Sequence, residues 1–346
     1  MVRRILFASV GFAPLVILAH YFLHPAETLE FVLASAALIP LAWLIGEATE
    51  HAAEHTGPGI GGFLNATFGN APELIIALFA VNAMEFEVVR GSLSGSVIGN
   101  LLLVLGFSLL FGGRGELDRG STFLSLALIG LAAALFLIVA IPGWDGDPER
   151  HSLAQLSIPI AVVLLLVYVA LTWYSLRRHR AQHIASDEEI KGWSLRFSLA
   201  VLGVATVVTA LVAEILVGSI DKFATDSGVS EFFLAAVVIA IVGNAAEHGG
   251  AVVVAYRGKI KLAAEIALAS AAQVAVFLIP AVILLAWFIE PVPLSFRKVE
   301  MLALAISLAV ATLVLYNGRS SRPRGAALIG AYVAIAFLFY QAGERF

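Results

Sequence analysis

Two short segments place a carboxylate inside a long apolar run. Residues 69–73 read GNAPE and residues 243–247 read GNAAE, each with apolar sequence on both sides. Each copy carries an asparagine and a glutamate three residues apart, a spacing that puts both side chains on one face of a helix. Because an ionised carboxylate is costly in apolar surroundings, we interpret Glu73 and Glu247 together as one cation site.

The first copy also carries a signal for a broken helix. Pro72 has no amide hydrogen, so the carbonyl oxygen of Phe68 loses its helical partner, and Gly69 weakens the same turn. We therefore expect the helix to break just before Glu73. The second copy has glycines on both sides of its glutamate but no proline, so its break signal is weaker.

The atoms that the two copies can offer to a cation are all oxygens. They are carboxylates, amide oxygens and freed main-chain carbonyls of Gly69, Asn70, Glu73, Gly243, Asn244 and Glu247. Such ligands suit Ca²⁺, which takes about 6–8 oxygens, and they leave Mn²⁺ and Na⁺ open as well. Two neighbouring carboxylates cannot both stay ionised cheaply once the metal leaves, so protons must replace it. The predicted chemistry is exchange of Ca²⁺ for H⁺.

The composition indicates which elements must hold these residues. The 346-residue chain is 60% hydrophobic and 13% charged, with a mean hydropathy of +0.95, which is far too apolar for a soluble domain. The absence of cysteine excludes disulfides and thiolate chemistry. Because the apolar runs repeatedly reach the length of a bilayer, we predict an all-α integral membrane protein with 11 transmembrane helices. The predicted spans are 5–23, 28–53, 61–83, 88–111, 122–141, 153–174, 193–220, 231–256, 262–289, 299–316 and 326–340.

The positions of the two copies predict how the halves of the chain are related. They fall in the third and eighth predicted spans, and this odd separation makes the second copy cross the membrane in the opposite sense. We predict a leading helix (1–25), a first five-helix repeat (26–175), a cytoplasmic linker (176–192) and a second five-helix repeat (193–346). Inverted repeats are typical of transporters whose site lies at the midplane, where broken helices meet.

Basic residues indicate the orientation of these spans. Of the 21 lysines and arginines, 14 fall on the side of the N-terminus, six fall on the other side, and Arg196 lies just inside a span. Cytoplasmic loops carry the excess of Lys and Arg, so we expect a cytoplasmic N-terminus and an external C-terminus. The short loops favour a prokaryotic plasma membrane. The sequence leaves the oligomeric state open, and homo-oligomers are compatible with it.

Further carboxylates and a histidine accompany the two copies. Glu50 lies one span before the first copy and Glu214 one span before the second, and both are candidates for proton relay or cavity lining. His248 directly follows Glu247 and so points about 100° away around the helix, which makes it a poor co-ligand. Its side chain titrates near neutrality in water, so it is a candidate for tuning the proton step.

Small polar residues occupy the span that follows each copy. The first half carries Ser96 with Asn100, and the second half carries Ser270 with Gln273. These side chains either contact the ion or allow close approach of helices, and the spacing leaves both alternatives open. Gly99 stands where a partner of Gln273 is expected in the first half.

The signature segments carry a family resemblance. Residues 61–75, GGFLNATFGNAPELI, and residues 243–248, GNAAEH, resemble the signature helices of the calcium/proton antiporter family within the cation/calcium exchanger superfamily. The resemblance implies a non-enzymatic transporter that needs no cofactor, with Ca²⁺ and H⁺ as transported substrates and the lipid bilayer, not nucleic acid, as its partner. It also implies that the paired glutamates are the ion ligands, and that the flanking acidic and small-polar positions are Glu50, Glu214, Ser96, Ser270 and Gln273.

One pattern favours a different class of protein. Residues 51–55 read HAAEH, which matches the H-x-x-E-H pattern of zinc hydrolases and would make His51, Glu54 and His55 the core of an intramembrane metalloprotease. The pattern lies at a predicted helix end beside a turn at 55–59 and has no counterpart in the other half. A cation channel is the other alternative, and symmetric halves with interrupted helices favour a carrier over it.

Overall fold

The structure, a computed structural model, describes residues 7, 9–180 and 192–343, and it describes their side chains except at 57–63, 65–66, 175–180 and 246–247. This part of the chain is almost entirely helical. Its elements are α2 (Phe12–Leu23), α3 (Glu27–Phe68), α4 (Ala71–Asn82), α5 (Phe86–Ile98), α6 (Leu105–Gly112), β1 (Gly115–Glu116), α7 (Arg119–Gly143), α8 (His151–Arg180), α9 (Leu195–Gly218), α10 (Ile220–Ser227), α11 (Glu231–Phe233), α12 (Ala240–Gly243), α13 (Ala245–Tyr256), α14 (Ile260–Gln273), α15 (Ile279–Ala286), α16 (Lys298–Leu315), β2 (Arg319–Ser320) and α17 (Arg322–Ala342). Three π-helices interrupt these helices: η1 (Gly99–Val104), η2 (Leu234–Ile239) and η3 (Val274–Leu278).

The length and composition of the helices indicate a multi-pass membrane protein, in agreement with the predicted class. Among the described residues, eight segments are long and apolar enough to cross a membrane: Glu27–Thr56, Phe86–Gly112, Arg119–Gly143, His151–Tyr174, Leu195–Gly218, Ile260–Ala286, Lys298–Leu315 and Arg322–Ala342. The pair Ile220–Ser227 and Glu231–Gly243, bent by 114°, is a ninth candidate. Helices α2 and α4 are shorter apolar segments. The count of 11 spans and the boundaries of the repeats stay predictions.

The turn predicted at 55–59 is wrong. Helix α3 continues through these residues and ends only at Phe68. A glycine-proline pair commonly ends a helix in water, where freed backbone groups find water as a partner. Within apolar surroundings no such partner is at hand, so continuing the helical hydrogen bonds is the cheaper arrangement.

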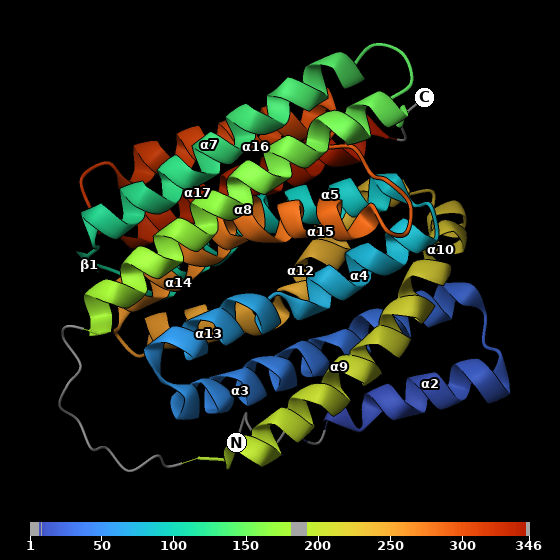
Figure 1. The fold of residues 1–346 in the computed structure, drawn as a ribbon, viewed down its shortest axis with the longest axis horizontal. Helices are drawn as coiled ribbons and strands as arrows, with labels where there is room; N and C mark the ends of the chain where they lie inside the picture. Colours follow the sequence, from blue (N-terminus) through green and yellow to red (C-terminus); the bar gives the residue numbers. More distant parts are fainter. Residues whose placement is uncertain (1–6, 8, 181–191, 344–346) are drawn as a thin grey trace.

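The helices are stacked in layers that bring distant parts of the chain together (Figure 1). Helices α7, α8, α16 and α17 lie along one side, and α2, α3 and α9 lie along the other, with α4, α5, α12, α13 and α14 between them. Helix α3 packs along α9, α17 packs on α6, and α5 contacts η2. The broken helices α3–α4 and α12–α13 therefore lie in the interior layer.

A glycine permits the closest of these contacts. A β-carbon added to Gly95 would lie 2.1 Å from the carbonyl oxygen of Ala236, which no real side chain tolerates. The backbone of α5 can therefore touch the backbone of η2 only because position 95 has no side chain. Small residues at such contacts are the usual means by which membrane helices approach one another.

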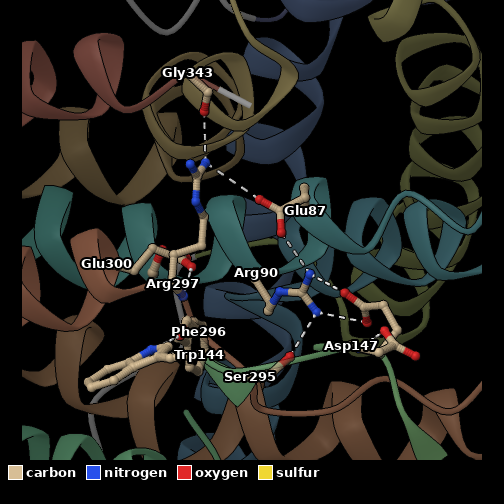
Figure 2. Close-up of polar contacts among 11 residues, drawn as sticks. Glu87, Arg90, Trp144, Asp147, Ser295, Phe296, Arg297, Glu300 and Gly343 are labelled. Carbon is tan, nitrogen blue, oxygen red and sulfur yellow. Dashed lines mark hydrogen bonds and ion pairs between the residues drawn. The ribbon is translucent and has the colours of Figure 1, made fainter. Parts of the chain in front are cut away.

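A buried ion-pair network, which we call the Arg90 clasp, joins the start of α5 to the segment before α16 (Figure 2). Arg90 is 2% exposed and donates both terminal nitrogens to the Glu149 carboxylate, at 2.6 and 3.0 Å. It also donates to Glu87 at 2.9 Å and to Ser295 at 3.3 Å. Bidentate pairing of this kind satisfies a buried guanidinium that would otherwise be very costly.

The clasp continues to the start of α16 and the end of α17. Arg297 pairs with Glu87 at 3.6 Å and donates to the carbonyl oxygen of Gly343 at 2.8 Å, beyond the last turn of α17. Glu300 accepts from the backbone N–H of Arg297 at 2.7 Å and from the Ser94 hydroxyl at 2.7 Å. One connected set of charges thus links α5, the α7–α8 loop, α16 and α17.

Helix α7 begins with a side-chain cap. The Asp118 carboxylate accepts from the backbone N–H of Ser121 at 2.9 Å and pairs with Lys261 at 3.2 Å. The hydrogen bond from Ser121 and the nearby Lys261 ammonium lower the pKa of Asp118 below its ordinary value of 3.8. Asp118 therefore stays ionised at neutral pH and fixes the entry of the chain into α7.

Candidate cation site

The break predicted in the first signature is present. Helix α3 ends at Phe68 and α4 begins at Ala71, with Asn70 between them at φ −99° and ψ 15°. Pro72 lies in the first turn of α4, where its missing N–H costs nothing. Glu73 is the third residue of α4, so its carboxylate lies at the end of the helix where the dipole favours negative charge.

The second signature breaks in the same way, although it has no proline. Helix α12 ends at Gly243 and α13 begins at Ala245, and Asn244 between them has φ −86° and ψ 7°, close to the angles of Asn70. Glu247 is the third residue of α13. Its side chain lies outside the described part of the structure, so only its place at the start of the helix is established.

The two breaks face each other across the interior layer. Glu73 is 7% exposed, and a β-carbon added to Gly243 would lie 3.1 Å from its Cγ and 3.5 Å from its Oε1. The carboxylate of the first signature therefore packs directly against the glycine that ends α12. This contact places Glu73 at the second signature, as expected for a site shared by both segments.

Asn244 is held by three hydrogen bonds. Its amide nitrogen donates to the Ser96 hydroxyl at 2.8 Å and to the carbonyl oxygen of Ala240 at 2.9 Å. Its amide oxygen accepts from the Asn100 amide nitrogen at 3.0 Å. Ser96, Asn100 and Asn244 are all buried. The structure thus joins the second signature to α5 and η1.

Asn100 is a site residue to which the sequence reasoning assigned no firm role. Its four-residue spacing from Ser96, which places both on one helix face, was the available signal. Its own amide oxygen is buried and accepts no hydrogen bond from any residue that the structure describes. An acceptor left in this state costs roughly 1–3 kcal/mol, and a cation is a group that would satisfy it.

The remaining predicted polar residues lie at different distances from this cluster. Ser270 is buried and Gln273 half-buried on the last turn of α14, which packs against η1. Glu50 and Glu214 are both exposed on α3 and α9, outside the buried cluster. Their proposed role in proton relay or cavity lining stays a prediction.

His248 lies in the first turn of α13 and is half-buried. Its backbone N–H donates to the carbonyl oxygen of Asn244 at 2.9 Å and so starts the new helix. Its Nε2 atom is buried and has no hydrogen-bond partner among the described side chains and backbone groups. A role in the proton step stays a prediction for this residue as well.

The H-x-x-E-H pattern serves helix packing in the structure. His51 lies between Glu47 at 3.5 Å and Glu54 at 3.3 Å, and its ring packs on Trp193. His55 bonds through Nε2 to the carbonyl oxygen of Trp193 at 2.7 Å. The two histidines thus engage different partners, and no three His, Asp or Glu side chains within the described part of the chain gather as a metal site. This geometry disfavours the metalloprotease alternative.

Comparison with known proteins agrees with this arrangement. The sequence model of the sodium/calcium exchanger protein family matches residues 27–177 and 197–341. The chain is 34% identical to a Ca²⁺/H⁺ antiporter of Aphanothece halophytica, with 98% of this chain and 96% of the relative covered. It is 36% identical to the Ca²⁺/H⁺ antiporter ChaA of Bacillus subtilis, with 92% and 93% covered.

Solved structures share the whole fold. The structure of native YfkE superposes with a TM-score of 0.84 at 33% identity and covers 97% of this chain and 99% of its own. The crystal structure of the H⁺/Ca²⁺ exchanger CAX has a TM-score of 0.76 at 15% identity, which speaks to the fold alone, over 98% of this chain and 92% of its own. Since the family match spans both signature breaks and both sets of flanking helices, the chain belongs to the sodium/calcium exchanger protein family.

Proposed function

We propose that this protein is a secondary antiporter that exchanges Ca²⁺ for H⁺ across a membrane. The observation that carries the proposal is the packing of the Glu73 side chain against Gly243, because it brings the carboxylate of one broken helix to the break of the other. The antiporters of Aphanothece halophytica and Bacillus subtilis, similar over nearly their whole length, support Ca²⁺ and H⁺ as the substrates.

The ligands in this proposal are oxygens from both signatures. Glu73 and Glu247 supply the charge, and Asn70, Asn244, Ser96, Ser270, Gln273 and Asn100 with the main chain at Gly69 and Gly243 supply neutral oxygens. Ca²⁺ accepts such a mixed set of hard ligands in flexible geometry. Ca²⁺ and H⁺ are cargo here, and the proposal needs no cofactor and no enzymatic step.

Charge balance explains why the two substrates are exchanged. The two glutamates are neutralised either by one divalent cation or by protons, and in both states the site presents little net charge to the apolar barrier. With neither bound, two carboxylates would have to cross that barrier ionised, which desolvation and mutual repulsion oppose. Switching between the two faces is therefore coupled to occupancy.

Two inverted five-helix repeats after a leading helix, 11 spans in all, provide the framework for alternating access in this proposal. The nearly equal backbone angles at Asn70 and Asn244 support the repeat. The excess of basic residues supports a cytoplasmic N-terminus and an external C-terminus. The bacterial relatives support a prokaryotic plasma membrane as the location.

The test is transport by the purified protein in lipid vesicles. An imposed pH gradient should drive Ca²⁺ uptake with proton counterflow, and Glu73→Gln or Glu247→Gln should abolish both, because the amide neither balances a divalent charge nor exchanges a proton. Ca²⁺ uptake is followed with an isotope and protons with an entrapped pH dye.

The matched control is Glu116→Gln, since Glu116 lies in β1, away from both helix breaks. It should retain full exchange. Exchange retained by Glu73→Gln would refute the proposed site, and Ca²⁺ flux that needs no counter-ion would indicate a channel. Competition by Mn²⁺ and Na⁺ in the same assay measures selectivity.

A further inference from the structure

The hydrogen bonds around Asn244 determine which way its amide points. The carbonyl oxygen of Ala240 can only accept, so the group that faces it at 2.9 Å must be the amide nitrogen of Asn244. The amide oxygen then faces Asn100, and Asn100 must present its own nitrogen to it at 3.0 Å. One orientation of both amides follows from the position of a single backbone carbonyl.

From this arrangement we infer that Asn100 is a positioning residue, which holds the amide oxygen of Asn244 in the orientation that the cation meets. The inference rests on the proposed function and assigns a role within the same site. Asn100 acts here through its amide nitrogen on Asn244. Fixing a ligand before the ion arrives lowers the cost of ordering it on binding.

The place of Asn100 in the fold suits this task. It is the second residue of π-helix η1, which follows α5. The wider turn of a π-helix displaces side chains from the positions that an α-helix would give them, and such turns are frequent at functional sites. Ser96 lies one turn earlier and holds the nitrogen of the same amide, so α5 and η1 grip both ends of Asn244.

The second half of the chain lacks this device at the corresponding position. Val274 follows Glu247 by the same number of residues as Asn100 follows Glu73, and it begins π-helix η3. A valine side chain has no donor, so it cannot hold Asn70 as Asn100 holds Asn244. The inference therefore predicts that Asn100 is energetically coupled to Asn244 and independent of Asn70.

Two double-mutant cycles test this prediction in the vesicle exchange assay. Asn100→Leu keeps the size of the side chain and removes the donor, and it should raise the half-saturating Ca²⁺ concentration by about 2- to 10-fold, the value of one buried hydrogen bond. The maximal rate should stay nearly unchanged. Combined with Asn244→Ala, Asn100→Leu should add no further effect, whereas its effect should multiply with that of Asn70→Ala.

Ser108→Ala is the control, because Ser108 is a buried hydroxyl further along the same helical run, in α6, and should leave the half-saturating concentration unchanged. If Asn100→Leu is poorly folded, Asn100→Ser, whose hydroxyl is too short to replace the amide, enters the same cycles. Multiplicative effects of Asn100→Leu and Asn244→Ala would overturn the inference and make Asn100 an independent ligand. That outcome leaves the proposed function intact, which fails only if Glu73→Gln still exchanges.

Discussion

The contact between Glu73 and Gly243 is the narrowest point of the site. The glycine leaves room for the methylene groups of Glu73, whose Cγ would lie 3.1 Å from any β-carbon at position 243. At that distance one of the two groups must move by a few tenths of an ångström. A glycine in a helical end therefore has a packing reason here, beyond its conformational freedom.

Gly243→Ala should consequently weaken Ca²⁺ exchange. Crowding a packed site by one methyl group costs roughly 1–3 kcal/mol, so the half-saturating Ca²⁺ concentration should rise by about fivefold or more. The comparison is Gly203→Ala in α9, where an added β-carbon meets nothing within 4 Å. Equal transport by the two variants in vesicles would contradict the packing described here.

The helix breaks follow the same geometry with different sequences. Pro72 stands in the first copy where the second has Ala246, yet both helices restart at the residue after the asparagine. The proline is therefore compatible with the break without being required for it. What the copies share is the asparagine preceded by glycine, and the carbonyl oxygens of Asn70 and Asn244 each accept from the residue after the glutamate, at 3.0 and 2.9 Å.

Pro72→Ala should therefore preserve the break and most of the exchange activity, because it converts the first motif into a copy of the second. We expect a change in exchange rate of no more than about threefold, less than 1 kcal/mol. The measurement is the initial rate of Ca²⁺ uptake per unit of reconstituted protein. Loss of transport with normal expression would mean that the proline itself maintains the break.

The Arg90 clasp acts at the scale of the whole molecule. It ties residues near position 90 to residues near positions 149, 297 and 343, so a large part of the chain closes on one buried guanidinium. Removing one partner from such a network leaves the others buried with uncompensated charge. The clasp therefore holds α5 in place, and with it Ser96 and Asn100.

Arg90→Met should destabilise the protein by about 3 kcal/mol and lower its unfolding temperature in detergent. Lys222→Met is the matched control, since Lys222 pairs with Asp226 at 2.6 Å but both side chains are exposed. An exposed pair is worth about 0–1 kcal/mol, so this variant should unfold near the wild-type temperature. Similar unfolding temperatures for the two variants would show that the clasp adds little to stability.

Several features of this protein followed from the sequence alone. Apolar runs of bilayer length determine a helical membrane protein, because every backbone group at membrane depth must bond within its own segment. The recurring Asn-x-x-Glu motif identified Glu73 and Glu247, since a carboxylate repeated in apolar sequence has no cheap structural reason. Pro72 predicted the first break from local chemistry.

Only the tertiary structure decided the rest. The second break at Asn244, the continuation of α3 through 55–59 and the role of Asn100 each depend on what lies beside the segment in space. His51 and His55 matched a metal motif in sequence, yet they engage Trp193 and neighbouring glutamates. Local patterns determine which residues are costly to bury, whereas the partners that offset the cost come from distant parts of the chain, which pack against them only when the fold is complete.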